Sequence, residues 1–328
     1  FKISPDETLR IVQELYEKKL VTYPRTDARV LSTAVSKEIT KNLNGLSKYQ
    51  MAAPYMQDIL HYGAYKNLAK TRYVNDKQIT DHYAIIPTGQ GLSALNSVSA
   101  TAHRVYDVIV RRFLSIFYPP AVYQKVALVT QIGKEQFFSN FRVLAEEGYL
   151  KVAGVPAPKK NANGNDAEGD GSDNNVDLDA AFFASIQKLK KGDILDVKSM
   201  DINEGETSPP KRYNSGSMIL AMENAGQLIE DEELRAQIKG SGIGTSATRA
   251  EILKKLFNIK YLALNKKTQV ITPTLLGEMI YDVVLNSIRS LLNPELTASW
   301  EKGLNYVAEG EITSDEYMTK LDHFIVSR

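Results

Sequence analysis

Leu20-Val21-Thr22-Tyr23-Pro24-Arg25-Thr26-Asp27 occupies residues 20–27, directly after a segment with strong helix signals. Ser4 and Pro5 are typical of an N-cap and a first helical position, and apolar residues recur from there at helical spacing. We therefore expect a helix from about Pro5 to Lys19. The proline of the quoted segment crowds the tyrosine before it, which predicts that this tyrosine is extended and lies outside the helix.

Tyr23 and Arg25 are suited to the transfer of a phosphodiester. A phenol can attack phosphorus, but its pKa of about 10 leaves it protonated at neutral pH, so a nearby cation or base is needed. On extended backbone, side chains two residues apart point to the same side, about 6 to 7 Å apart, and could bracket one phosphate. Asp27 continues the alternation and could hold Arg25 or a neighbouring loop. The alternative is that Tyr23, one of 17 tyrosines, merely packs against its surroundings.

The wording of this segment resembles the active-site segment of type IA DNA topoisomerases, and of their topoisomerase III branch in particular. Three further blocks resemble the family in the same order along the chain: Asp81-His82-Tyr83-Ala84-Ile85-Ile86-Pro87-Thr88, Ser208-Pro209-Pro210-Lys211-Arg212-Tyr213 and Gly242-Ile243-Gly244-Thr245-Ser246-Ala247-Thr248-Arg249. One block alone would be a weak match. Four in order, over most of the chain, support the resemblance.

The resemblance implies the roles of the reactive residues. Tyr23 would attack a DNA backbone phosphate, form a 5′-phosphotyrosine bond and release a 3′-hydroxyl. Arg25 would position that phosphate and stabilise its charge. The whole enzyme would cleave one DNA strand, pass another strand through the gap and religate.

The resemblance also assigns DNA contacts to five further residues: His82, Arg212, Thr245, Thr248 and Arg249. For the histidine, the alternative is a buried side chain with satisfied hydrogen bonds, and the family role includes tuning the charge of the active site. For the glycine-rich block, hydroxyls and a cation at a helix N-terminus suit a backbone phosphate. The alternative there is a plain turn, with Thr245 or Ser246 as the N-cap.

The composition limits the possible classes of protein. The chain has 328 residues, 43% of them hydrophobic, which is enough for two or three domains with cores of their own. Forty Lys and Arg balance 39 Asp and Glu, so any grip on DNA must come from local patches. The absence of cysteine excludes disulfides and Cys-bound zinc within the chain. No apolar run is long enough for a membrane span, and the first residue, Phe1, favours a piece of a longer protein.

In the middle of the chain, the spacing of apolar residues changes from a helical to an alternating pattern. Residues 44–77 look irregular, and a helix is expected over residues 99–117, with Val108 on its apolar side. Alternating β-branched and aromatic residues then predict strands over residues 122–132, 136–145 and 194–202. Between them, residues 156–179 are so polar that we expect a disordered surface loop.

The last third predicts helices again, over residues 218–225, 246–257 and 273–288, with a hairpin of residues 261–264 and 270–271 between the last two. Helix, hairpin and helix in this order indicate a winged-helix-like unit. Lys260-Tyr261-Leu262 follows its helix much as Lys19-Leu20-Val21 follows the first helix. We expect a structural similarity between the two places.

The expected fold class is multidomain α and β, with mainly helical, winged-helix-like domains and a β-rich arch, as in the central region of a type IA topoisomerase. We expect three domains: 1–117, helical and bearing the tyrosine; 118–212, the β-rich arch with the loop 156–179; and 213–328, helical, winged-helix-like and DNA-binding.

The resemblance also indicates partners and what is missing. The partner is DNA, mainly single-stranded, with no membrane, in the bacterial cytoplasm near the nucleoid. The family's metal-binding TOPRIM domain precedes the tyrosine segment and is not in this chain, so Mg²⁺ would be bound by ligands outside it and the isolated fragment would be inactive. Two alternatives stay open. One is a bacterial topoisomerase I, which the Thr-Tyr-Pro-Arg and Ala-Thr-Arg wording disfavours, and the other is a non-catalytic single-stranded DNA-binding protein.

Overall fold

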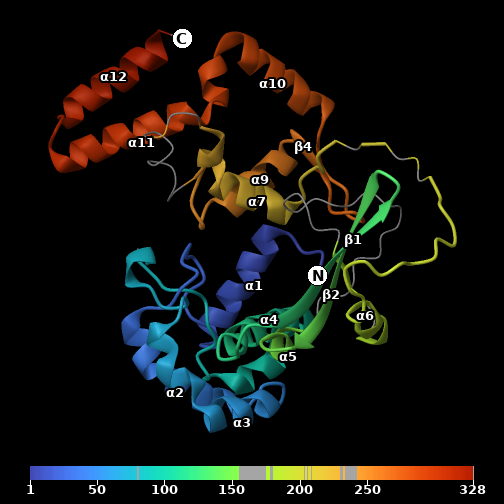
Figure 1. The fold of residues 1–328 in the computed structure, drawn as a ribbon. Coiled ribbons are helices and arrows are strands. Elements are labelled where there is room, and N and C mark those ends of the chain that lie inside the picture. Colours follow the sequence, from blue (N-terminus) through green and yellow to red (C-terminus); the bar gives the residue numbers. More distant parts are fainter. Residues whose placement is uncertain are drawn as a thin grey trace. The chain divides into compact units, whose positions relative to one another are not determined.

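The chain forms two compact units, each built from segments that are far apart in the sequence (Figure 1). The computed structural model describes residues 1–79, 81–154, 175–177, 180–202, 204, 206–207, 209–229, 232 and 242–327. Unit 1 comprises Phe1–Thr33, Asn75–Tyr106 and Lys211–Arg328, and unit 2 comprises Ala34–Val74 and Asp107–Pro210. These units cut across the three expected segments, because contacts between distant segments do not follow chain order.

The first helix of unit 1, α1 (Pro5–Glu17), begins as predicted. The Ser4 hydroxyl accepts a hydrogen bond from the Glu7 backbone N–H at 3.0 Å, and Pro5 stands in the first turn. Its buried residues, Ile11, Val12 and Leu15, lie on one helical face. The helix ends before the expected Lys19, which adopts a left-handed conformation with φ of 62°.

Residues on both sides of Tyr23 bond to the backbone of residues 84–88, and Tyr23 lies outside the helix, as predicted. Val21 and Pro87 form an antiparallel bridge. The Thr22 N–H donates to the Ile86 carbonyl at 3.0 Å, and farther along the Ala84 N–H donates to the Val30 carbonyl at 2.9 Å. This pairing holds the tyrosine segment against the block that contains His82.

The rest of unit 1 is mainly helical. The predicted hairpin is confirmed as β4 (Leu262–Leu264) and β5 (Ile271–Pro273), which pair antiparallel between two helices. The helices are α7 (Ser215–Glu223), α9 (Arg249–Asn258), α10 (Leu275–Ser287), α11 (Pro294–Glu309) and α12 (Ser314–Val326), with short 3-10 helices η2 (Asp76–Gln78), η3 (Leu92–Ser97), η4 (Ala225–Leu228) and η5 (Arg289–Leu292). Helix α9 packs against α1, α7 and β4, and so joins the ends of the chain.

The turn after α9 has the same backbone as the turn after α1, as the similar wording of the two places predicts. Lys19 and Lys260 both have φ of 62°. The residue after each lysine donates its N–H back into the preceding helix, from Leu20 to the Leu15 carbonyl and from Tyr261 to the Leu256 carbonyl. A Pro-Thr pair lies opposite each turn. The Thr88 N–H donates to the Leu20 carbonyl, and the Thr274 N–H donates to the Tyr261 carbonyl.

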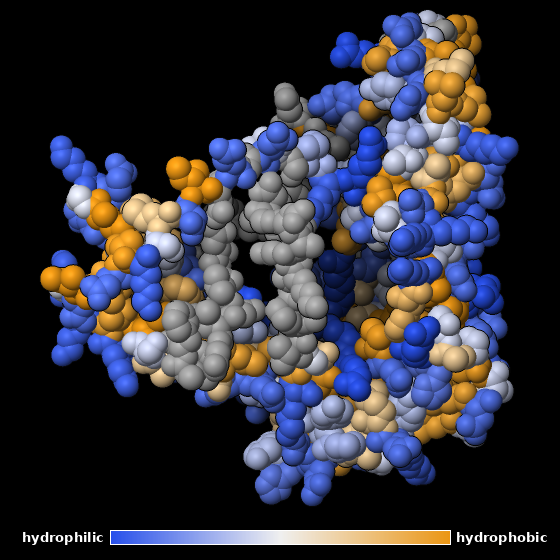
Figure 2. Space-filling view, turned by 90° about the vertical axis from the view of Figure 1, so that its right-hand side faces the viewer, coloured by the Kyte–Doolittle hydropathy of each residue, from blue (hydrophilic) through white to orange (hydrophobic). Residues whose placement is uncertain are grey.

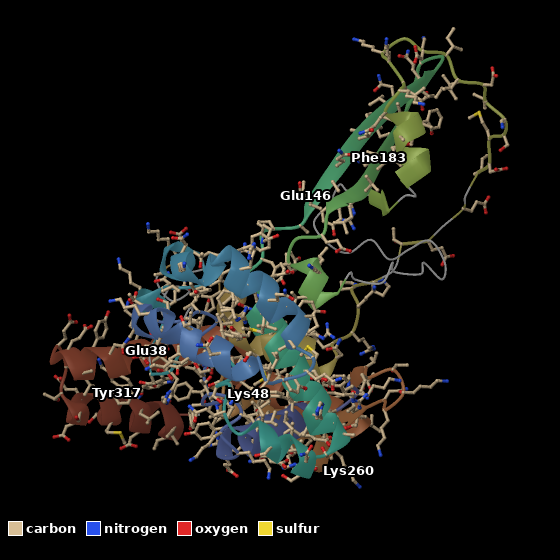
Figure 3. All side chains as sticks on the ribbon, turned by 90° about the horizontal axis from the view of Figure 1, so that it is seen from below. Glu38, Lys48, Glu146, Phe183, Lys260 and Tyr317 are labelled. Atoms are coloured by element: carbon tan, nitrogen blue, oxygen red, sulfur yellow. The ribbon has the colours of Figure 1, made fainter. Side chains whose placement is uncertain are left out.

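Unit 2 combines helices with an extended hairpin. Two of its helices have their first residues in unit 1 and continue in unit 2: α2 (Thr33–Leu46) and α4 (Ala100–Ser115). The other elements are α3 (Ala53–Tyr62), η1 (Ala64–Lys70), β1 (Val122–Ile132), β2 (Glu135–Glu146), α5 (Leu150–Ala153), β3 (Asn175–Asp177) and α6 (Ala180–Ile186). The sheet order is β1-β2-β3, with β1 and β2 antiparallel and β2 and β3 parallel. In Figure 3 the β1–β2 hairpin extends from the helices of this unit, with Phe183 of α6 alongside it.

Three sequence expectations in unit 2 were wrong. Residues 44–77 are not irregular, since α3 and η1 lie there and bury Met56, Ile59 and Leu68. Residues 194–202 form no strand, and Ile194 is 93% exposed, because alternation alone supplies no neighbouring edge to pair with. Val108 is 53% exposed, because the buried face of α4 follows different residues: Ala102, Val105, Tyr106, Val110, Phe113 and Leu114.

Most of the expected loop of residues 156–179 lies outside the described residues, and residues 175–177 of it form β3. No helix in the described part of the chain is long and apolar enough to cross a membrane. On the face drawn in Figure 2, hydrophilic and hydrophobic residues are interspersed.

Candidate active site around Tyr23

The ring of Tyr23 lies between two other rings. Its centroid is 5.4 Å from that of Tyr16 on α1, in an edge-on arrangement, and 4.4 Å from that of His82, tilted by 43°. Tyr23 is half-buried and His82 is exposed. The structure therefore brings the predicted nucleophile and the predicted histidine into direct contact, although 58 residues separate them in the chain.

Two threonines fix this contact. The Thr22 hydroxyl donates to the Ala84 carbonyl at 3.3 Å and accepts from the Ile86 N–H at 2.9 Å. The Thr26 hydroxyl donates to the carbonyl of His82 at 2.8 Å and accepts from the N–H of Ala28 at 3.0 Å. The sequence analysis did not single out either threonine. Their placement on both sides of Tyr-Pro-Arg was the available signal, since a hydroxyl can replace a backbone partner where strand pairing is irregular.

Arg25 and Asp27 take different directions. Arg25 is exposed, and within the described residues no hydrogen bond or ion pair occupies its guanidinium. Asp27 does not hold Arg25. Its carboxylate binds Arg249, with 3.2 Å between Oδ1 and Nη1, so the second of the two sequence alternatives, a neighbouring loop, is the one observed. A guanidinium without a protein acceptor is available to phosphate oxygens.

The glycine-rich block forms a tight loop before α9. Gly242 and Gly244 have φ of 61° and 67°, and the Ile243 N–H donates to the Met222 carbonyl at 2.8 Å. The hydroxyls of Thr245 and Thr248 lie 3.2 Å apart, and the Thr248 hydroxyl accepts from the Thr245 N–H at 2.9 Å. Both threonines thus stand together at the N-terminal end of α9.

The N-cap of α9 is Thr248, without a side-chain capping bond, rather than Thr245 or Ser246. The helix nevertheless turns its first backbone N–H groups toward this end. The N–H groups of Thr248 and Arg249 both donate to the Thr245 carbonyl at 3.0 Å, whereas the side chains of Thr245 and Thr248 are exposed.

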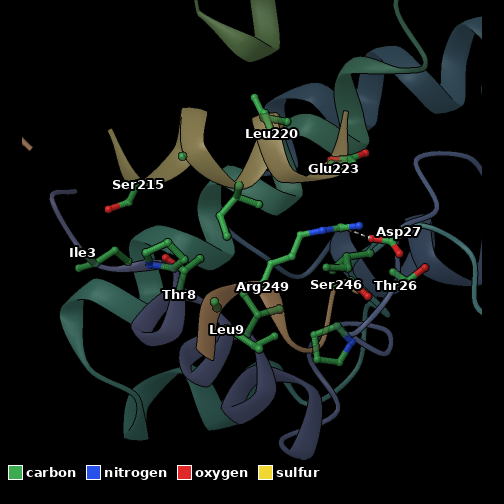
Figure 4. A pocket seen from close by; sticks show the side chains of 17 residues that line it. Ile3, Thr8, Leu9, Thr26, Asp27, Ser215, Leu220, Glu223, Ser246 and Arg249 are labelled. Carbon is green, nitrogen blue, oxygen red and sulfur yellow. Dashed lines mark hydrogen bonds and ion pairs between the residues drawn. The ribbon is translucent and has the colours of Figure 1, made fainter. Parts of the chain in front are cut away.

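Arg249 is buried, with 3% of its surface exposed. Besides its bond to Asp27, it donates from Nε to the Ile243 carbonyl at 3.1 Å and from Nη2 to the Gly244 carbonyl at 2.9 Å. Figure 4 shows the side chain crossing from α9 to Asp27. The sequence analysis expected a DNA contact here, whereas the structure gives these donors acceptors within the protein.

A cleft of about 490 Å³ lies behind the tyrosine segment (Figure 4). Pro24, Thr26 and Asp27 line one side, and apolar residues of α1 and α7 line another. At its edge Glu223 accepts from Arg29, with 2.7 and 2.9 Å between Nη2 and the two carboxylate oxygens. The tyrosine segment is thus attached to α7 and to α9 by separate ion pairs.

Arg212 lies elsewhere in unit 1. It is exposed, and the residue after it, Tyr213, accepts from the Ile271 N–H of β5 at 2.8 Å. No contact found among the described residues joins Arg212 to Tyr23 or to His82. Arg212 is therefore placed beside the β4–β5 hairpin.

The described residues contain no group of three or more His, Cys, Asp or Glu side chains placed to hold a metal ion. Asp27 and Glu223, two carboxylates that line the cleft, are each occupied by an arginine. These residues do not fit a Mg²⁺ site, and no step proposed below depends on one within this part of the chain.

Comparison with known proteins identifies the family. The family model described as DNA topoisomerase matches residues 1–319. The chain belongs to the DNA topoisomerase family. The DNA topoisomerase 3 of Bacillus licheniformis is 34% identical over 328 residues, which cover 99% of this chain and 41% of that protein. The corresponding Bacillus subtilis protein is 34% identical over 318 residues, 96% of this chain and 40% of that protein.

These relatives confirm the resemblance to topoisomerase III that the sequence blocks indicate. The chain spans about 41% of the length of the first of these topoisomerases. The structure of full-length topoisomerase I from Thermotoga maritima is also similar, with a TM-score of 0.58 and 20% identity, over 99% of this chain and 46% of that one. At this identity the similarity shows the fold, which is that of a region of a type IA topoisomerase.

Proposed function

We propose that this chain is the part of a topoisomerase III-like, ATP-independent type IA enzyme that carries the nucleophile, Tyr23. The observation that supports it most is local. The Tyr23 ring touches His82, Arg25 beside it is without a protein acceptor among the described residues, and two threonines pin both segments. The whole enzyme would cleave one DNA strand, pass a strand and religate.

Cleavage would exchange one bond to phosphorus for another. The Tyr23 hydroxyl oxygen forms a bond to phosphorus while the bond from phosphorus to the 3′-oxygen breaks. The phenol loses one proton, and the departing 3′-oxygen gains one. Arg25 would bind the non-bridging oxygens as their charge develops, and the contacting imidazole of His82 would tune the charge around the phenol. Religation is the reverse.

The DNA contacts would be spread over unit 1. His82, Arg212, Thr245 and Thr248 are exposed or half-buried and offer donors to the backbone of a single strand. Arg249, the fifth residue assigned to DNA, is buried, so we propose that it acts on the strand indirectly. The bound partner would be mainly single-stranded DNA. The enzyme would act in the bacterial cytoplasm, near the nucleoid.

The whole enzyme would use the three expected domains of this chain in different ways. Residues 1–117 would carry the nucleophile, residues 118–212 would form the arch with its extended β1–β2 hairpin, and residues 213–328 would be the winged-helix-like DNA-binding part. Helix α9, the β4–β5 hairpin and α10 support the last assignment by their order. Mg²⁺ would be held by residues outside this chain, and the isolated chain would bind single strands weakly without cleaving them.

Two other functions are less well supported. A bacterial topoisomerase I would use the same tyrosine, but the curated relatives above are named topoisomerase 3. A non-catalytic single-strand binder would have no need for a phenol held against an imidazole beside an unpaired guanidinium. The decisive difference is a covalent protein–DNA adduct.

The test is Tyr23→Phe in the full-length parent protein. We expect the variant to bind a single-stranded oligonucleotide as the parent does but to form no adduct, because only the attacking oxygen is removed. With the oligonucleotide labelled at its 3′ end, the parent should acquire the label, since the intermediate is a 5′-phosphotyrosine. Tyr62→Phe is the matched control, because Tyr62 is 78% exposed and lies in unit 2. An adduct formed by Tyr23→Phe would refute the assignment.

A further inference from the structure

The buried guanidinium of Arg249 connects two functional segments. Two of its nitrogens donate to carbonyls of the loop before α9, at Ile243 and Gly244, and the third binds Asp27. All three nitrogens are therefore occupied inside the protein, and the side chain is only 4% exposed. Such a residue has little surface left for a DNA phosphate.

The far end of this connection is the tyrosine segment. Asp27 is two residues from Arg25 and four from Tyr23, on backbone that Thr26 ties to the carbonyl of His82. This backbone is short and pinned, so a shift of Asp27 displaces the groups beside it. The near end is the loop that carries Thr245 and Thr248, where we propose that the single strand is bound.

We infer that Asp27 and Arg249 are positioning residues that couple occupancy of the glycine-rich loop to the placement of Tyr23 and Arg25. The inference rests on the proposed function. DNA held by the loop would fix the carbonyls to which Arg249 donates, and the arginine would then hold Asp27 and the tyrosine segment in the geometry needed for attack. Neither residue would touch the DNA.

The chemistry of arginine supports this role. A guanidinium is planar and presents donors in several directions at once, which suits three acceptors on two segments, whereas the ammonium of lysine is a compact point charge. A nearby ion pair offers a contrast. Lys254, five residues farther along α9, binds Asp6 of α1 at 3.1 Å, but its side chain is 47% exposed and it lies away from the loop. That pair serves as the control.

The test is a double-mutant cycle in the full-length parent protein, with Asp27→Asn, Arg249→Gln and the double variant. For each variant we would measure the rate of single-turnover cleavage of an oligonucleotide. The dissociation constant of the protein–oligonucleotide complex would be measured at several salt concentrations. We expect each single variant to cleave about 100-fold more slowly, the scale of effect that a misplacement of about 1 Å causes. Oligonucleotide affinity and its salt dependence should stay unchanged.

The double variant should be no slower than the slower single variant, because both changes remove the same connection. Arg249→Lys should be about as slow as Arg249→Gln, and Lys254→Gln should cleave at the parent rate. If Arg249→Gln does not fold, as judged by thermal unfolding, Asp27→Asn and Asp27→Glu carry the test, since both disturb the ion pair but leave the Arg249 side chain packed on its two carbonyl acceptors.

Two results would overturn the inference. Additive effects of the two single changes would show that the residues act separately. Weaker binding by Arg249→Gln alone, with a salt slope reduced by about 0.7, would show that the arginine contacts a phosphate directly. A parent protein that forms no adduct at all would instead refute the proposed function.

Discussion

The turn after α1 and the turn after α9 are built alike, yet only the first leads to the proposed nucleophile, Tyr23. Each has a lysine in the left-handed conformation, a next residue whose N–H donates back into the helix, and a Pro-Thr pair that bonds to the turn. Four residues after its lysine, the first turn has Tyr23 and the second has Leu264. In the second turn the chain folds straight back as the β4–β5 hairpin. After the first turn, the segment that lies opposite is residues 82–88, and it places His82 against Tyr23.

This difference shows that the scaffold alone does not create the site. The same backbone can present a leucine in a short hairpin or a phenol beside an imidazole. What decides is the segment that returns to pair with the turn, together with the ion pairs that hold it from behind.

The largest effect is expected where a glycine closes each turn, at Gly91 and Gly277. A Cβ at Gly91 would lie 2.4 Å from the Lys18 carbonyl oxygen, and one at Gly277 would lie 2.1 Å from the Tyr261 carbonyl oxygen. We expect Gly91→Ala and Gly277→Ala each to lower the free energy of unfolding by about 3 to 5 kcal/mol, measured by urea denaturation.

Gly133→Ala is the matched control, because Gly133 has φ of 62° but open space around it. It should cost only the left-handed strain of about 1 to 2 kcal/mol. Gly277 is the sharper case, since it lies inside α10, where alanine is intrinsically favoured over glycine by about 1 kcal/mol. A Gly277→Ala chain that is more stable than the original would show that the two turns are not closed by the same contact.

A smaller effect is expected where the helices that precede the two turns pack together, at the ion pair between Asp6 on α1 and Lys254 on α9. The hydrogen bond from Lys254 holds the pKa of the Asp6 carboxyl below its usual value. Because the folded pKa is lowered, the stabilisation is present above the unfolded pKa of about 3.9 and is lost as the pH falls through the folded pKa.

Asp6→Asn should therefore lower the melting temperature slightly at neutral pH, and the difference from the original chain should close below about pH 4. Thermal unfolding followed from pH 2 to pH 7 measures this. Asp322→Asn is the control, because Asp322 is exposed and no hydrogen bond or ion pair of its carboxylate occurs among the described residues. A difference that grew on acidification would contradict the assignment.

The smallest effect is expected when the second turn receives a tyrosine. Leu264→Tyr in a full-length parent that also carries Tyr23→Phe should form no covalent adduct with a 3′-labelled oligonucleotide. The new phenol would face Ile271 across the hairpin, without an imidazole or an unpaired guanidinium beside it. An adduct on residue 264 would show that the shared turn is sufficient for reactivity.

The sequence analysis succeeded where the structure depends on neighbouring residues. The Ser4–Pro5 start of α1, the bounds of β1 and the β4–β5 hairpin follow from capping, alternation and turn chemistry, which act over a few residues. It failed at residues 194–202, which alternate like a strand but have no neighbouring strand there, and at α3, whose apolar pattern is short. At residues 194–202 the deciding fact is that no strand pairs with them among the described residues, which local alternation cannot reveal.

The site divides in the same way. The local wording of residues 20–27 was enough to propose Tyr23 and Arg25 and to expect extended backbone between them. Tertiary structure decided that Tyr23 touches His82, that Thr22 and Thr26 fix this contact, and that Asp27 binds Arg249 instead of Arg25. Asp27 and Arg249 are 222 residues apart in the chain. No local pattern marks such a pair, because an ion pair depends on where folding places two side chains and not on their separation in sequence.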